Sequence, residues 1–235
     1  MGFFCMQPLW LLDSIGSRLI IDEQLVFSDL SDSCIGNYFL QLGIWGQRST
    51  FFKQTPIKNC FLIATHSFGE IDLVTDFSHL PIQEKTVDVV FLPHTLEQCN
   101  NQREVLSTST NAIKESGTLI ALGFNPISLW GLRHWFSGKN FLPGIHRLIS
   151  LNQYTRWLVD FGFRVEKIHY FHAIMPQRKE HELPLKNKMF NPFLCACYMI
   201  VARKEVIPIT LEQQFIKEKK QTGSLVDSMS STQYE

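Results

Sequence analysis

Short apolar runs alternate with turn signals and polar or helical stretches between residues 36 and 123. This alternation is typical of βαβ units, in which a crossover segment follows each strand. The five strands predicted in this region are Tyr38–Leu42, Asn59–Ala64, Ile71–Thr75, Val87–Leu92 and Thr118–Leu122. The nearly continuous apolar character of these runs predicts central strands that are covered on both faces.

The rest of the chain adds helices and two further strands to this pattern. A helix is predicted from about residue 97 to residue 115, with Gly117 as its C-terminal cap. Residues 124–150 mix glycine and proline with aromatic residues, which predicts a lid-like insertion over a site. A helix over 151–161 and strands over 163–171 and 195–202 predict the antiparallel pair that closes some open α/β sheets.

Together these elements predict a doubly wound, mostly parallel seven-stranded α/β sheet with a final antiparallel strand. The sheet is assigned to a domain over residues 36–205, and residues 1–35 are expected to form a helical segment that packs on it. Residues 206–235 become polar and rich in serine, threonine and glutamine without periodicity, which predicts a disordered tail.

The apolar N-terminal stretch from Gly2 to Leu12 is too short to span a membrane, and it has no basic segment before it. We therefore expect it to pack on the domain, with no stable membrane insertion. A membrane-surface anchor is the alternative, since six of its apolar side chains can also face lipid. These are Phe3, Phe4, Leu9, Trp10, Leu11 and Leu12.

Composition and charge narrow the classes of partner. The 235 residues contain 22 basic and 22 acidic side chains, so the chain lacks the positive excess that nucleic-acid binding requires. Six cysteines without CxxC spacing indicate a reduced, cytoplasmic setting. Cys195 and Cys197 lie on one face of a strand, but no second pair has zinc-ligand spacing, so no metal site is predicted. The oligomeric state stays open.

Residues that follow the predicted strands are the candidates for chemistry, because ligands bind beyond the carboxyl ends of an open parallel sheet. Gly43 and Gly46 follow the first strand, and Asp76 follows the third. His94 follows the fourth strand, and Asn125 follows the fifth. The two glycines permit a tight turn and a close approach of the backbone to a ligand, although an ordinary turn also explains them.

The order of these segments resembles the class I S-adenosylmethionine-dependent methyltransferases of the type 11 methyltransferase-domain kind, whose fold is Rossmann-like. The resemblance is carried by Asp76-Phe77-Ser78-His79-Leu80-Pro81 and by the following segment 88–97, Asp-Val-Val-Phe-Leu-Pro-His-Thr-Leu-Glu. In the family, the aspartate of the first string lies near the adenine, and the second segment lines the cofactor and acceptor side. The resemblance implies S-adenosylmethionine as cofactor, a small-molecule methyl acceptor, and five cofactor-binding residues. These are Gly43, Gly46, Asp76, Phe77 and Leu80.

His94 is the candidate general base, because an imidazole with an ordinary pKa near 6.5 accepts a proton near neutral pH. The alternative is a wall residue that hydrogen-bonds to the backbone. Glu97 is expected to begin the following helix, where a carboxylate complements the helix dipole. Asp76 has an alternative as well, since aspartate often caps a helical turn.

The first motif departs from the family pattern. Gln41 stands at the usual acidic position, Trp45 replaces the middle glycine and Gln47 replaces the last one. The second strand ends in Ala64-Thr65-His66, with no acid for the ribose hydroxyls. Losing a charge-assisted hydrogen bond of about 1.5–3 kcal/mol predicts cofactor binding that is about tenfold to a hundredfold weaker.

Two classes of function follow from this sequence. The first is methyl transfer by direct displacement of the methyl group of the cofactor by an acceptor. The aromatic residues after Gly123, such as Trp130 and Phe136, suggest that this acceptor is apolar or amphipathic. The second is a non-catalytic pseudo-methyltransferase that serves as a binding or scaffold module. A nicotinamide-dependent oxidoreductase fits poorly, because the full GxGxxG fingerprint is missing.

Overall fold

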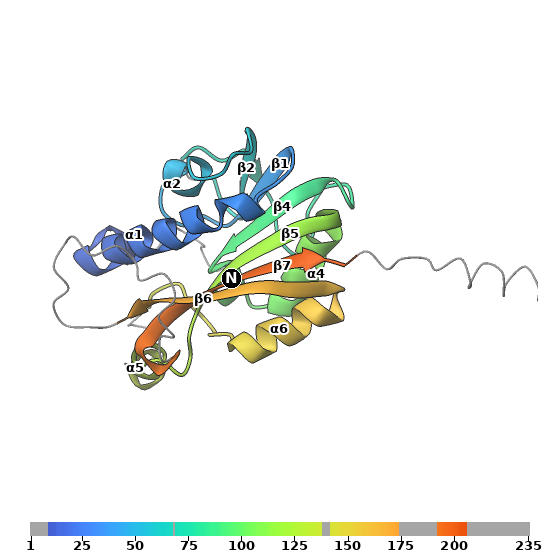
Figure 1. Ribbon diagram of the computed structural model, residues 1–235. Helices are drawn as coiled ribbons and strands as arrows, with labels where there is room; N and C mark the ends of the chain where they lie inside the picture. The colour runs from blue at the N-terminus through green and yellow to red at the C-terminus, as the bar shows by residue number, and fades with distance from the viewer. Residues whose placement is uncertain (1–8, 68, 138–141, 174–191, 206–235) are drawn as a thin grey trace, which may run out of the picture. The chain divides into compact units, whose positions relative to one another are not determined.

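The computed structural model describes residues 9–67, 69–137, 142–173 and 192–205 (Figure 1). These residues form one seven-stranded sheet in the order β3-β2-β1-β4-β5-β7-β6. The strands are β1 Tyr38–Leu42, β2 Asn59–Ala64, β3 Leu73–Val74, β4 Val87–Pro93, β5 Ile113–Phe124, β6 Phe163–Ala173 and β7 Cys195–Lys204. β1 to β5 pair in parallel, and β7 is antiparallel to both β5 and β6. The predicted fold class is confirmed.

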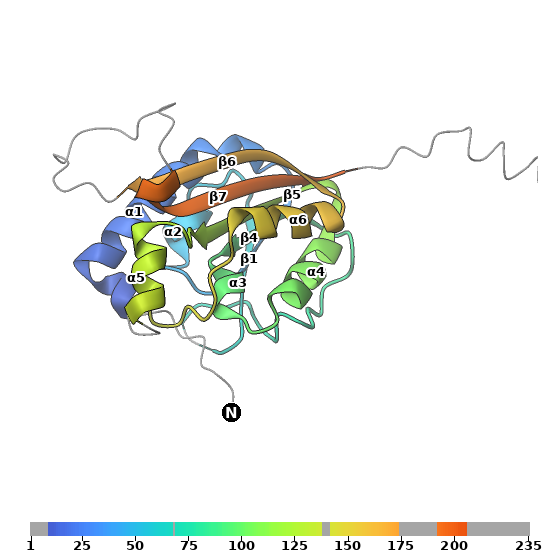
Figure 2. The same cartoon turned by 90° about the horizontal axis from the view of Figure 1, so that it is seen from below.

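Helices cover both faces of this sheet (Figure 2). In chain order they are η1 Leu9–Leu12, α1 Ser14–Asp29, η2 Ser31–Ser33, α2 Ser49–Phe52, α3 Thr95–Gln98, α4 Gln102–Ala112, α5 Leu129–Ser137, α6 Leu151–Asp160 and η4 Pro192–Leu194. Side chains of α1 and α2 join a core cluster on one face, and side chains of α4 and α6 join a second cluster on the other. Successive side chains of each strand point to opposite faces of the sheet, so each strand contributes residues to both clusters.

α1 buries its apolar stripe against the sheet. Phe27 is fully buried, and its ring lies 4.9 Å from that of Phe91, 5.4 Å from that of Phe51 and 6.1 Å from that of Phe39. Leu19, two turns earlier on the same helix, is also fully buried. The first helix therefore completes the core of the strands that follow it. Residues 206–235, the predicted disordered tail, lie outside the described residues.

The prediction of a single helix over residues 97–115 is wrong. α3 ends at Gln98, α4 spans Gln102–Ala112, and the chain then enters the long strand β5 at Ile113. Gly117 lies inside β5, where a Cβ atom would come within 2.9 Å of the carbonyl oxygen of Asp88. Close approach to the neighbouring strand, and not a helix cap, therefore requires this glycine. The predicted third strand is also shorter than expected, because it pairs only through Leu73 and Val74.

Asp88 lies near the amino end of β4, so it does not reach the loops that follow the strands. Its carboxylate accepts hydrogen bonds from the backbone N–H groups of Asn37 and Tyr38, both at 3.0 Å, and pairs with Lys114 at 2.8 Å. Burial by itself raises the pKa of this carboxyl, but these hydrogen bonds lower it below its ordinary value. Asp88 therefore fixes the backbone where β1 begins.

Replacing Asp88 should make stability less sensitive to acid. The pKa of Asp88 is lowered in the folded state. The charged carboxylate therefore contributes to the free energy of unfolding above the ordinary carboxyl pKa, and this contribution is lost as the pH falls through the folded-state pKa. We expect Asp88→Asn to lower the free energy of unfolding by about 1–2 kcal/mol at pH 7 and by much less at pH 3, measured by urea denaturation.

Asp160→Asn is the matched control for this experiment. Asp160 forms an exposed pair with Arg103, so its loss should cost below about 1 kcal/mol at either pH. An Asp88→Asn effect of equal size at pH 7 and pH 3 would contradict the assigned role of the charge.

Candidate functional site

The carboxyl ends of β1 to β5 meet at one edge of the sheet, because these strands are parallel. The loop after β1 is fixed to the neighbouring strand, since the backbone N–H of Gly43 donates to the carbonyl oxygen of Ile63 in β2 at 2.8 Å. The turn that begins at Asp76 follows β3, which lies directly beyond β2. The structure thus brings the predicted glycine loop and the predicted adenine-side turn to one edge.

Gly43 and Gly46 adopt positive φ angles of 93° and 70°, which favour glycine. A Cβ atom at Gly43 would lie 3.1 Å from the hydroxyl oxygen of Thr95, and one at Gly46 would lie 2.9 Å from that of Thr50. Both positions therefore need glycine for local reasons. Their role in binding a cofactor stays a prediction.

Trp45, between the two glycines, directs its indole into the core. The side chain is fully buried, and its Nε1–H donates to Glu23 Oε2 at 2.6 Å. The indole also lies against the rings of Trp10 and His94, at centroid distances of 6.0 and 4.5 Å. Trp45 therefore fills the space beneath α1 and does not project to the solvent side of the loop.

Gln41, at the position where the family usually has an acid, is also buried. Its amide Nε2 donates to the carbonyl oxygen of Gly43 at 3.0 Å. Its Oε1 has no hydrogen-bond partner among the described residues. A buried acceptor without a partner is costly, so this atom offers a place to a donor group of a bound molecule.

The segment after β3 forms a tight turn at the same edge. The carboxylate of Asp76 is exposed and accepts from the backbone N–H of Ser78 at 2.9 Å, as in an Asx turn. Phe77 is only 2% exposed and belongs to the second core cluster, and Leu80 packs partly buried against that cluster. Asp76 is thus the member of this predicted set whose polar atoms face solvent.

No carboxylate replaces the missing ribose-binding acid among the residues that directly follow β2. Thr65 Oγ1 and His66 Nδ1 lie 3.0 Å apart there. The nearby Asp72 is engaged elsewhere, since it pairs with Arg48 at 2.6 Å and accepts from the backbone N–H of Leu62 at 2.7 Å. The hydroxyl of Thr65 and the imidazole of His66 are the polar groups that this position offers.

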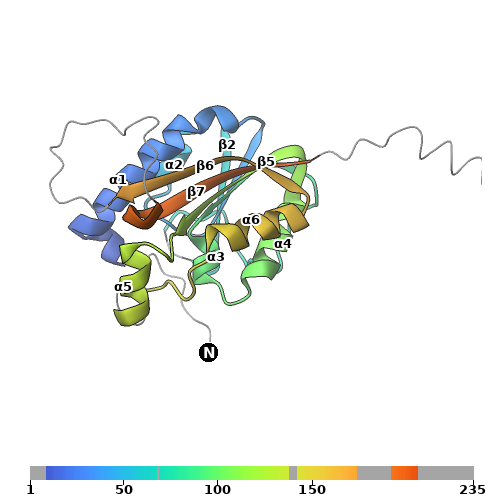
Figure 3. The same cartoon turned by 60° about the horizontal axis from the view of Figure 1, so that its bottom comes forward.

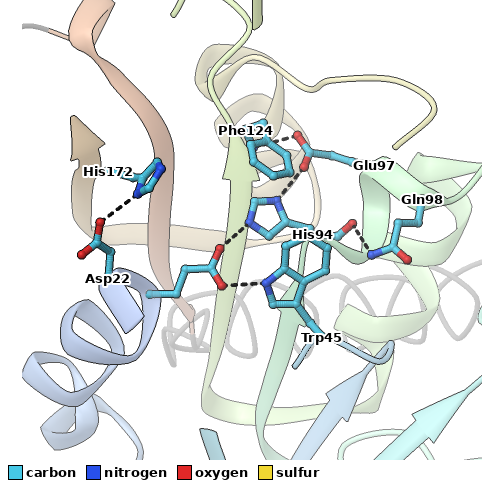
Figure 4. Close-up of polar contacts among 8 residues, drawn as sticks. Asp22, Trp45, His94, Glu97, Gln98, Phe124 and His172 are labelled. Carbon is cyan, nitrogen blue, oxygen red and sulfur yellow. Dashed lines mark hydrogen bonds and ion pairs between the residues drawn. The ribbon is translucent and has the colours of Figure 1, made fainter. Parts of the chain in front are cut away.

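His94 lies between two buried carboxylates (Figure 4). Its Nε2 is 3.0 Å from Glu23 Oε1 and its Nδ1 is 2.8 Å from Glu97 Oε2, and His94 and Glu23 are fully buried. Glu97 Oε1 in turn accepts from the backbone N–H of Phe124 at 2.9 Å. This network joins α1, the turn after β4 and the end of β5.

The charge of His94 follows from these contacts. Burial by itself lowers the pKa of the imidazole, but the hydrogen bonds and charges of Glu23 and Glu97 raise it to about 9. His94 is therefore protonated at neutral pH, and both ring nitrogens are engaged. Its role as a general base stays a prediction, and it requires the imidazole to lose a proton and one of the two bonds to open.

Glu23 is the residue of this network that the sequence interpretation missed. Leu19, Glu23 and Phe27 follow one another at four-residue spacing, so a charged residue lies inside the apolar stripe of α1. A charged residue at a position that faces the core is the sequence signal by which Glu23 could have been recognised. Its partner His94 lies 71 residues further along the chain, which no local pattern reveals.

The aromatic segment after β5 divides into a packed part and an exposed part. Trp130 is 8% exposed and its ring stacks on that of Phe124 at 6.3 Å, whereas Trp135 and Phe136 are more than 80% exposed. All but Phe124 belong to α5, which lies beside the start of β7 (Figures 1 and 3). Phe141 lies outside the described residues.

The comparisons with known proteins agree with this arrangement. The family model described as a methyltransferase domain matches residues 59–121, a range that includes the Asp76 turn and His94 but not the glycine loop. A crystal structure of an S-adenosylmethionine-dependent methyltransferase from Archaeoglobus fulgidus is 19% identical, with a TM-score of 0.58 over 77% of this chain and 94% of that one. The fold is that of the class I S-adenosylmethionine-dependent methyltransferases, and residues 59–121 match the methyltransferase-domain model.

Two further relatives define how far the similarity extends. A Thermotoga maritima structure, described as a possible histamine N-methyltransferase, has a TM-score of 0.62 and 13% identity over 84% of this chain and 93% of that one. The uncharacterized protein YafS of Escherichia coli (strain K12) is 32% identical over 163 residues. The match covers 69% of this chain and 66% of YafS.

None of the helices in the described part of the chain is both long and apolar enough to cross a membrane.

Proposed function

We propose that this chain binds S-adenosylmethionine at the carboxyl edge of β1 to β3 and transfers its methyl group to an apolar or amphipathic small molecule. The observation that carries the proposal is the exposed Asp76 turn after β3, two strands from the glycine loop after β1, whose backbone is hydrogen-bonded to the intervening strand β2. The family match covers this turn and supports the same interpretation.

Each predicted residue has a defined task in this proposal. The loop at Gly43 and Gly46 presents backbone to the cofactor, because no side chain stands at these two positions. Asp76 accepts from the adenine amino group, and Phe77 and Leu80 support the turn from the core. The free Oε1 of Gln41 accepts from a donor of the cofactor, such as its ammonium group.

The acceptor class is inferred from α5. S-adenosylmethionine supplies an already activated methyl group, so the protein mainly has to hold the acceptor in line with it. Trp135 and Phe136, together with the half-exposed Leu132, give α5 an apolar surface beyond the end of β5. An apolar or amphipathic acceptor would cover these side chains and gain the free energy of burying them.

Isothermal titration with S-adenosylmethionine and, separately, S-adenosylhomocysteine tests the cofactor site. We expect saturable micromolar binding, and binding about tenfold weaker for Asp76→Asn, because a neutral amide oxygen would replace the charged carboxylate as the acceptor of the adenine amino group. Asp160→Asn, which removes an exposed carboxylate of another surface pair, should bind as the wild type does. Unchanged binding by Asp76→Asn would mean that Asp76 stabilises its turn and does not bind the cofactor.

The second candidate is a non-catalytic scaffold, and the missing ribose-binding acid favours it. Absence of binding to the wild type up to millimolar cofactor would establish this alternative. Thr65→Asp separates the two cases further, since Thr65 stands where β2 ends. A functional cofactor site should gain affinity from the new carboxylate, whereas a remodelled scaffold should only lose stability.

A further inference from the structure

Three side chains with metal-ligating atoms meet beneath α1. Glu23 comes from α1, His94 from the turn after β4, and Cys197 from β7. One ligand atom of each lies within 4.8 Å of the others, and all three side chains are fully buried. The proposed methyl transfer gives no task to Cys197, so this cluster is unexplained by that function.

The donor set is one that zinc accepts. Zinc binds carboxylate oxygen, imidazole nitrogen and thiolate sulfur, with bond lengths of about 2.0–2.3 Å. Donor atoms around one such ion are separated by about 3–4 Å, by this geometry. The separations of up to 4.8 Å in the cluster therefore need only a small rotation of side chains to close on an ion.

Hydrogen bonds orient the ligating atoms from outside. Glu97 Oε2 lies 2.8 Å from His94 Nδ1, and the Trp45 indole N–H donates to Glu23 Oε2 at 2.6 Å. The remaining atoms, His94 Nε2 and Glu23 Oε1, point toward each other at 3.0 Å. A carboxylate on the far nitrogen of a histidine ligand is the arrangement that fixes the ring and strengthens it as a donor in metal sites.

We propose that Glu23 Oε1, His94 Nε2 and Cys197 Sγ form a zinc-binding site. When Zn²⁺ enters, the proton on His94 Nε2 and the proton on Cys197 Sγ leave, so two positive charges replace two. The net charge of this buried region is unchanged, so zinc binding adds no uncompensated charge there.

The site would connect segments that are far apart in the sequence. Glu23 belongs to α1, His94 to the turn after β4, and Cys197 to β7. Metal bound to the folded state and not to the unfolded chain stabilises the fold by mass action. Zinc would therefore fasten α1 to the strands, independently of whether the chain binds S-adenosylmethionine.

Metal analysis and cobalt titration of the full-length protein test the site. We expect one Zn²⁺ per chain after purification, and a thiolate-to-Co²⁺ charge-transfer absorption when the chelator-treated protein is titrated with Co²⁺.

Cys195→Ser is the matched control for Cys197→Ser. Both cysteines are fully buried on β7, but Cys195 is not part of the cluster. We expect Cys195→Ser to keep the charge-transfer band and Cys197→Ser to lose it. Glu23→Gln should weaken Co²⁺ binding at least tenfold, and it provides a second variant if Cys197→Ser fails to fold.

Three results would overturn the site. They are a wild-type protein that takes up neither Zn²⁺ nor Co²⁺, a Cys197→Ser variant that keeps the band, and a purified protein that carries another metal in place of zinc. None of them measures cofactor binding, which the titration with S-adenosylmethionine tests separately.

Discussion

His94→Ala is expected to lower the free energy of unfolding by about 3–5 kcal/mol, the largest effect of any single polar substitution proposed for this chain. The variant removes the cation that Glu23 and Glu97 share, and both carboxylates are buried, with exposures of 0% and 1%. An uncompensated charge in the interior costs more than the pair itself contributes. Urea denaturation at pH 7 in the presence of a chelator measures the effect of the ion pairs alone.

Two further variants make the experiment with His94 decisive. Adding Glu23→Gln to His94→Ala should recover part of the lost stability, because it removes one of the two stranded charges. His79→Ala, which truncates an exposed histidine, should change the free energy of unfolding by less than about 0.5 kcal/mol. A loss below 1 kcal/mol in His94→Ala would contradict the charged network.

Phe27→Ala is expected to cost about 3–5 kcal/mol as well, for an apolar reason. The Phe27 ring is fully buried and contacts three other phenylalanine rings of the sheet and α2. Its removal forfeits the burial of the ring and leaves a cavity that the surrounding strands cannot close. Thermal and urea unfolding both measure this loss.

Ile21→Ala on the same helix is the control for Phe27→Ala. The Ile21 side chain is 54% exposed, so its truncation should cost below about 0.5 kcal/mol. Equal effects of the two variants would mean that α1 does not dock on the sheet through the face described above.

The sequence predicted the strands of this fold better than its helices. The limits predicted for the first two strands, Tyr38–Leu42 and Asn59–Ala64, match β1 and β2. Their continuous apolar runs report burial on both faces, which is a local property. The helix over 97–115 failed because Ile113 begins a strand beside Val87, and this pairing depends on a contact 26 residues away.

The candidate site shows the same division between local and distant information. The turns at Gly43, Gly46 and Asp76 could be predicted because turn geometry requires particular residue types within a few positions, whereas their role in binding stays a prediction. The charge state of His94 was not found, because it depends on Glu23 from another helix. The inward direction of Trp45 was not found either, since it depends on the same carboxylate.

The position of β7 has a consequence for the order of assembly during synthesis. β7 is the last strand of the described residues, yet it lies between β5 and β6 in the sheet. While a ribosome still holds residues 195–204, β6 lacks the only strand with which it pairs in the described structure, and β5 has an open edge. Until β7 emerges, a nascent chain therefore exposes unpaired edges of both β5 and β6, which are surfaces that a chaperone could bind.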